Sequence, residues 1–158
     1  MENEQKYHVV AWWTSGRTGL AKSDSAPNAI HFTAPPQFGG LEGRWTPEDL
    51  LIAALASCFT TTFHAIAASS KFEYTDLAVE VDGTVSKTNT GYGFSEIAIR
   101  TNLTISNEEE RGRSIRLLQK AKACCLVSRA LATAQKFEVM VETRKAFTRV
   151  TAERNISV

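Results

Sequence analysis

The sequence predicts an α+β fold in a single domain of 158 residues. Strand-like and helical stretches are grouped along the chain instead of alternating, which argues against a doubly wound parallel sheet. With 43% hydrophobic residues, the chain can build a sizeable core. We expect one domain over residues 1–158, with flexible ends at about 1–5 and 148–158.

The first third of the chain predicts short strands. Residues 7–14 are rich in Val, Trp and Tyr, a glycine-containing turn follows at 15–19, and short extended runs lie at 20–23 and 29–33. Two prolines and two glycines then make residues 35–40 irregular.

A long helix is predicted over residues 47–69. Thr46 can cap it, Pro47 suits the first helical position, and two carboxylates follow in the first turn. We expect this helix to be largely buried, because apolar or small side chains recur at helical spacing. These are Leu51, Ala54, Leu55, Cys58, Phe59, Thr62, Phe63 and Ile66.

The remaining chain predicts a hairpin, a second helical region and a last strand. Alternating apolar residues over 72–86 and 94–105 flank a turn, which is typical of a hairpin. A capping pattern at 106–109 begins a second helical region, which we expect to break near residue 122. A strand over 137–143 completes the core.

Charge and apolar patterning narrow the classes of partner. The 18 Lys and Arg residues nearly balance 17 Asp and Glu, and no basic run indicates nucleic-acid binding. The longest apolar stretch, around 50–56, is too short for a membrane span, and the acidic N-terminus does not resemble a signal peptide. We expect a cytoplasmic protein that binds neither nucleic acid nor membranes, and no metal, because the histidines and cysteines lack ligand spacing.

Three cysteines do not suit a secreted disulfide framework. Cys58, within the long helix, is either a core residue or a nucleophile. A nucleophile must be a thiolate, and burial alone raises the pKa of a thiol, so we expect a cation nearby. The candidate cations are Arg17, in a turn, and Arg44, before the helix.

Several segments resemble the OsmC/Ohr family of thiol peroxidases in order and spacing. They are residues 15–19 (SGRTG), 35–40 (PPQFGG), 46–51 (TPEDLL), 54–59 (ALASCF) and 125–131 (CLVSRAL). The resemblance implies an OsmC-like fold, with antiparallel sheets packed around two long central helices in an intertwined homodimer. It also implies reduction of alkyl or lipid hydroperoxides in oxidative-stress defence.

The same resemblance implies the residue roles. Cys58 is expected to be the peroxidatic cysteine, and Cys125 to resolve its sulfenic acid as a disulfide. Arg17 is expected to stabilise the thiolate and hold the peroxide, and Glu48 to orient Arg17. The alternatives are that Arg17 is a solvated turn residue and Glu48 a helix N-terminal charge. No bound cofactor is implied, and the reductant is expected to be an external dithiol such as a lipoyl group on a carrier protein.

Helix geometry bears on how such a site is assembled. Ten residues of one straight helix separate Glu48 from Cys58 by roughly 15 Å, too far for one side chain to bridge. Either Arg17 spans part of this gap, or Glu48 serves the site of a neighbouring subunit. We favour the second arrangement, a site composed from two subunits.

Two positions depart from the family pattern. Lys122 stands where many members have His, three residues before the second cysteine. Cys124 adjoins Cys125, and consecutive helical residues point about 100° apart, so only one of the two can face Cys58 well. Cys125 is the expected partner, and Cys124 as the resolving residue is the open alternative.

Apolar side chains near Cys58 predict an apolar peroxide pocket, lined by Phe38, Leu51 and Phe59. The alternative is that these residues fill the core or a dimer interface. The competing function is a non-catalytic dimeric protein that binds an apolar ligand or senses redox state.

Overall fold

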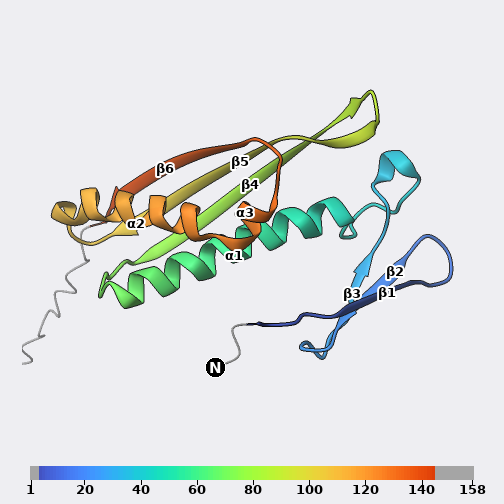
Figure 1. The fold of residues 1–158 in the computed structure, drawn as a ribbon, viewed down its shortest axis with the longest axis horizontal. Helices are drawn as coiled ribbons and strands as arrows, with labels where there is room; N and C mark the ends of the chain where they lie inside the picture. Colours follow the sequence, from blue (N-terminus) through green and yellow to red (C-terminus); the bar gives the residue numbers. More distant parts are fainter. Residues whose placement is uncertain (1–3, 145–158) are drawn as a thin grey trace, which may run out of the picture. The chain divides into compact units, whose positions relative to one another are not determined.

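The computed structural model describes residues 4–144, and the chain divides into two compact units within one helix, between Leu55 and Ala56 (Figure 1). Each unit contains a three-stranded sheet, and each also contains helical residues. The predicted α+β class is therefore confirmed. The predicted flexible segment 148–158 lies outside the described residues, as do residues 1–3.

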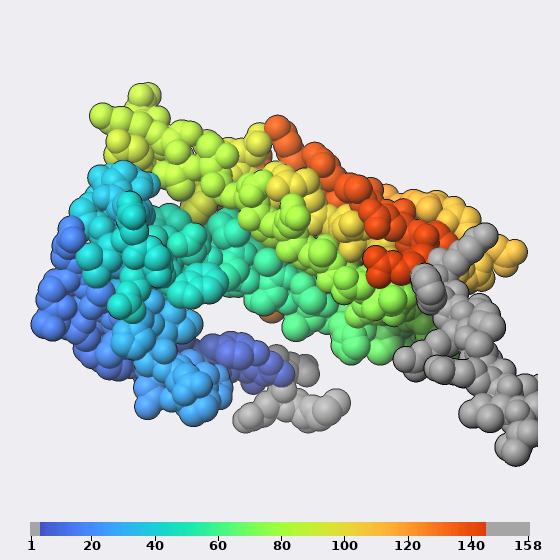
Figure 2. All heavy atoms as spheres, turned by 180° about the vertical axis from the view of Figure 1, so that it is seen from behind, coloured from blue at the N-terminus to red at the C-terminus, as the bar shows by residue number. Residues whose placement is uncertain are grey.

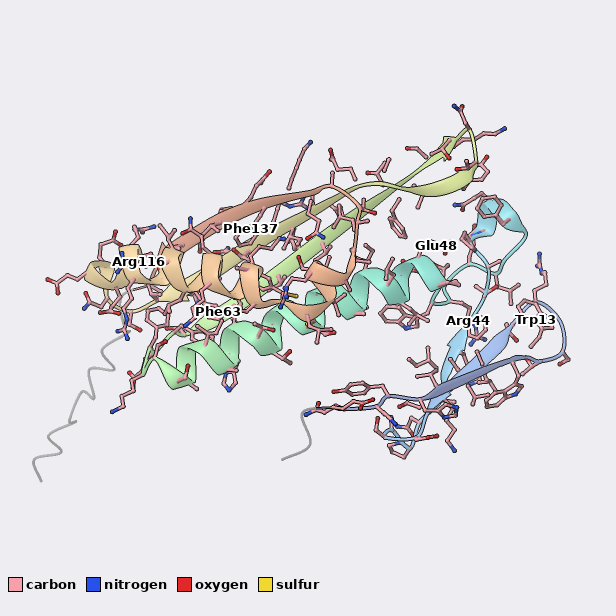
Figure 3. The ribbon with its side chains drawn as sticks, viewed as in Figure 1. Trp13, Arg44, Glu48, Phe63, Arg116 and Phe137 are labelled. Atoms are coloured by element: carbon pink, nitrogen blue, oxygen red, sulfur yellow. The ribbon has the colours of Figure 1, made fainter. Side chains whose placement is uncertain are left out.

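The first unit contains an antiparallel sheet in the order β1-β2-β3. Its strands, β1 (Val9–Trp13), β2 (Gly19–Ser23) and β3 (Ile30–Phe32), lie within one residue of the predicted runs or inside them. All five residues of β1 are exposed, and Trp13 projects from the strand (Figure 3). This sheet therefore leaves large apolar side chains exposed in the single chain.

Thr33 connects the turn that contains Arg17 to the loop that contains Leu41. Its hydroxyl donates to the carbonyl of Arg17 at 2.8 Å and accepts from the backbone N–H of Leu41 at 3.1 Å. The loop that contains the short helix η1 (Pro36–Phe38) folds tightly here, since a Cβ on Gly40 would lie 1.5 Å from the carbonyl oxygen of Ala34. The fully buried Thr33 thus fixes the position of the turn that carries Arg17.

Helix α1 spans Pro47–Ser69, as predicted. The hydroxyl of Thr46 accepts from the backbone N–H of Asp49 at 3.2 Å, and the Asp49 carboxylate accepts from the backbone N–H of Thr46 at 2.9 Å. This reciprocal pair is a capping box, with the carboxylate at the third helical position. It accounts for the sharp start of α1.

The expectation that α1 is largely buried is wrong for the single chain. Full burial is confined to a row at four-residue spacing, formed by Leu55, Phe59, Phe63 and Ala67. The second half of α1, in green, reaches the surface in Figure 2. α1 is also long and apolar enough to cross a membrane, which corrects the prediction that no stretch reaches that length, although a core helix meets the same two criteria.

The second unit contains a mixed sheet. The predicted hairpin is formed by β4 (Asp76–Thr88) and β5 (Gly91–Ile105), which pair antiparallel. β6 (Gln135–Thr143) pairs with β5 in parallel, so the expectation of antiparallel sheets alone is wrong here. A parallel neighbour requires a crossover connection, which the intervening helices supply.

One face of the mixed sheet carries the core. The inward-facing residues of β5 are at most 1% exposed: Ile97, Ile99, Thr101, Leu103 and Ile105. From α1, Phe59 packs against Phe137 of β6 with ring centroids 5.6 Å apart. Phe63 and Phe137 both point into the layer between helices and sheet (Figure 3).

The helical crossover has three parts, η2 (Glu108–Glu110), α2 (Arg111–Cys124) and α3 (Leu126–Ala130). Asn107 caps its start by accepting from the backbone N–H of Glu109 at 3.0 Å. The break predicted near residue 122 falls at Cys125, whose backbone is extended with ψ 112°. With 14 residues in α2 and 23 in α1, the described part of the chain supplies one long helix.

Replacing Phe59 by Ala should lower the free energy of unfolding by about 3–5 kcal/mol, because the side chain is fully buried and its removal leaves a cavity against Phe137. Urea denaturation measures this change. Thr60→Ala is the matched control, since its exposed side chain bonds only the α1 backbone, at Ala56. Equal stability of the two variants would contradict this packing.

Candidate functional site

Cys58 lies on α1 at the edge of its buried row. Its neighbour Phe59 is fully buried, Ser57 is exposed, and Cys58 itself is half-buried. The thiol therefore borders the core of the second unit and retains partial access to solvent.

Cys125 lies at the break between α2 and α3 and is fully buried. Its backbone N–H donates to the carbonyl of Ala121 at 2.8 Å, and its own carbonyl accepts from the N–H of Arg129 at 3.0 Å. Cys125 thus ends one helix and begins the next. Because a helix begins here, the backbone N–H groups that follow Cys125 lack partners within α3.

Hydrogen bonds lower the pKa of Cys58 against the effect of burial. Burial alone would raise it, but the backbone N–H of Val127, the thiol of Cys125, the hydroxyl of Thr62 and the backbone N–H of Leu126 all favour the thiolate. Their combined effect holds the pKa of Cys58 below the ordinary value of a thiol. Cys58 therefore ionises more readily than an ordinary cysteine.

The pKa of Cys125 moves the other way. Burial is the largest cause of its raised pKa, and the hydrogen bond and negative charge of Cys58 raise it further, against the backbone N–H groups of Ser128 and Val127. Cys58 therefore ionises first, and Cys125 remains a thiol that donates to it. Of these two free cysteines, Cys58 is therefore the more readily ionised.

Cys124 differs from Cys125 in its surroundings. It is the last residue of α2, and its side chain is exposed. The structure brings Cys125, and not Cys124, into hydrogen-bond contact with Cys58.

The expected ion pair between Arg17 and Glu48 is not formed within the described first unit. The Arg17 guanidinium donates from Nη1 to the carbonyl of Gly39 at 2.9 Å. Glu48 lies in the first turn of α1 (Figure 3), where its Oε2 is buried without a hydrogen-bond partner. A buried carboxylate oxygen without a donor is costly, so this half of the expected site is incomplete.

The three side chains expected to line a peroxide pocket have different environments. Phe38, in η1, is 51% exposed, and Leu51 is half-buried on α1. Phe59 is 0% exposed and packs on Phe137, so it belongs to the core and not to an open pocket in the single chain.

Sequence reasoning missed the groups that stabilise the Cys58 thiolate. It required a cation, whereas the donors found here are two backbone N–H groups, a thiol and the hydroxyl of Thr62. Thr62 follows Cys58 by four residues, a helical spacing that brings side chains together and could have indicated it. Residues 4–144 contain no group of three or more His, Cys, Asp or Glu side chains that could hold a metal ion.

Comparisons with known proteins show which proteins this chain is similar to. The chain is 23% identical over 131 residues to an uncharacterised Bacillus subtilis protein, YmaD, spanning 81% of this chain and 87% of that one. It is 28% identical over 95 residues to the Escherichia coli peroxiredoxin OsmC, spanning 60% of this chain and 65% of that one. An organic hydroperoxide resistance protein from Elizabethkingia anophelis has the same fold, with a TM-score of 0.71, 23% identity, and coverage of 91% of this chain and 100% of that one.

A family model described as OsmC-like protein matches residues 40–140, which include both Cys58 and Cys125. Because this match covers more than half of the chain, the protein belongs to the OsmC-like family.

Proposed function

We propose that this protein is a Cys-based peroxidase that reduces organic hydroperoxides to alcohols. Membership of the OsmC-like family supports a stress-related peroxidase or redox function. The observation that carries the finer proposal is the contact between Cys58 and Cys125, with a lowered pKa on the first and a raised pKa on the second.

The reaction uses both cysteines in turn. The Cys58 thiolate attacks one peroxide oxygen, the O–O bond breaks, and the alkoxide leaves and takes up a proton to form the alcohol. Sulfur loses two electrons and becomes a sulfenic acid. The Cys125 thiol then attacks this sulfur and loses its proton, an S–S bond forms, and water leaves. An external dithiol, such as a lipoyl group on a carrier protein, reduces the disulfide in the cytoplasm.

A site composed from two subunits accounts for the positions of Arg17 and Glu48. Glu48 precedes Cys58 by ten residues on α1, and its buried Oε2 lacks a donor. The exposed residues of β1, including Trp12 and Trp13, offer apolar area for a subunit contact. In the proposed homodimer, Arg17 and Glu48 of one subunit complete the site around Cys58 of the other.

Replacing Cys58 by Ser should abolish consumption of cumene hydroperoxide with dihydrolipoamide as reductant, because a serine hydroxyl cannot supply the thiolate that attacks the peroxide. The matched control, Cys124→Ser, should retain the activity. Loss of hydroperoxide is measured against dithiol-free mixtures. Unchanged consumption in Cys58→Ser would support a ligand-binding protein instead.

In the wild type, kcat/KM for cumene hydroperoxide should exceed that for H2O2, and an inverted order would contradict an apolar site.

One equivalent of hydroperoxide should produce a disulfide between Cys58 and Cys125, because the buried Cys125 thiol already contacts the Cys58 sulfur. Mass spectrometry of peptides from the non-reduced protein identifies the crosslink. A Cys58–Cys124 crosslink in the wild type would overturn the assignment of the resolving cysteine.

Mixing inactive variants tests the two-subunit site. Subunits of Cys58→Ser and Arg17→Met, each inactive alone, should regain about one quarter of wild-type activity after denaturation and joint refolding. Half of the dimers are then mixed, and one of their two sites is complete. Sites built within single subunits would regain no activity, and sedimentation of a fully active monomer would also contradict the proposal.

A further inference from the structure

The donors that face Cys58 belong to a helix of only five residues, α3. A helix this short is unstable by itself, so contacts with the rest of the protein must hold its first turn in place. Ser128, which follows Leu126 and Val127 in this turn, is 4% exposed. Its hydroxyl therefore has to find partners within the protein.

Ser128 connects α3 to two other elements. Its Oγ accepts from Nζ of Lys122, in the last turn of α2, at 2.7 Å. The same hydroxyl donates to Oε1 of Gln135 at 2.6 Å, and Nε2 of Gln135 donates to the Ser128 carbonyl at 2.9 Å. Gln135 is the first residue of β6, so the network anchors α3 to the sheet as well as to α2.

We propose that the network of Lys122, Ser128 and Gln135 holds the first turn of α3 against Cys58, and that Lys122 is a positioning residue for this nucleophile. Lys122 makes this contact with Ser128, so it acts through α3. The inference rests on the proposed function only in taking Cys58 as the reacting thiol.

Three other ionisable side chains on the surrounding elements have other partners or are exposed. On β6, Lys136 pairs with Glu96 of β5 at 2.8 Å. On α1, His64 bonds the hydroxyl of Tyr74 at 3.1 Å. Arg129 of α3 is exposed. Lys122, in contrast, contacts the turn through Ser128.

Replacing Lys122 by Met keeps most of the aliphatic chain and removes the ammonium donor. If α3 shifts, the backbone N–H groups leave Cys58, its thiolate becomes less favoured, and its pKa rises. The pKa is measured from the pH dependence of alkylation by iodoacetamide, with the Cys58 peptide quantified by mass spectrometry. Where the pKa lies above neutral pH, each unit of increase lowers the thiolate fraction at neutral pH about tenfold, and because a more basic thiolate is also more nucleophilic, alkylation should slow by about threefold. Lys120→Met, on an exposed position of the same helix, is the control and should leave the pKa unchanged.

Two further variants separate positioning from charge. Ser128→Ala keeps the positive charge and breaks the network, so it should also raise the pKa of Cys58. Lys122→Arg keeps both charge and donors and should retain most of the wild-type reactivity. A raised pKa in Lys122→Met alone, with Ser128→Ala unchanged, would assign the effect to charge and overturn the proposal. Wild-type pKa values in both folded variants, as judged by circular dichroism, would overturn it too.

The readout separates this inference from the proposed function, because alkylation requires no peroxide. A wild type without peroxidase activity whose Cys58 pKa still depends on the network would contradict the proposed function and support the positioning role. An active wild type whose Cys58 pKa stays the same when the network is broken would support the proposed function and contradict the positioning role.

Discussion

A thiolate at the edge of a core needs hydrogen-bond donors in place of the water it loses, and this requirement explains much of the second unit. Cys58 is adjacent to the fully buried Phe59, so burial opposes its ionisation. The break in the helical crossover at Cys125 supplies donors, since the N–H groups at the start of α3 have no partners within that helix. The crossover is itself required by the parallel pairing of β5 and β6. The sheet topology and the surroundings of Cys58 are thus connected through the same short segment.

The hydrogen bond between the two cysteines orders their chemistry. The same contact that lowers the pKa of Cys58 raises the pKa of Cys125, so Cys58 loses its proton before Cys125. Burial strengthens the difference, because Cys125 is fully buried and Cys58 is not. In the proposed peroxidase, this arrangement would leave the Cys58 sulfur accessible and keep the Cys125 thiol in contact with it for disulfide formation. Because neutral donors lower the pKa of Cys58, the pair does not require the nearby cation that sequence reasoning expected.

The local sequence pattern predicted most helices and strands. The features that it missed depend on contacts between residues far apart in the chain. The bounds of α1 follow from the Thr46 capping box and from helical spacing, both of which are written in a few consecutive residues. The parallel register of β6 with β5 depends on residues more than 30 positions apart, so no local pattern encodes it. The donors to Cys58 were missed because backbone N–H groups carry no residue identity: Leu126 and Val127 appear in the sequence only as apolar side chains.

In the first unit, Glu48 lacks the kind of hydrogen-bond donors that Cys58 has in the second. Its buried Oε2 lacks a donor, and a buried polar atom left in this state costs about 1–3 kcal/mol. Arg17 of the same unit already donates to the Gly39 carbonyl, in a turn that Thr33 holds in place. A second subunit that supplies a donor to Glu48 would remove this cost, and covering Trp12 and Trp13 would bury apolar area at the same time. Both effects favour association, so the pairing of chains and the completion of the proposed site would be driven by the same free energy.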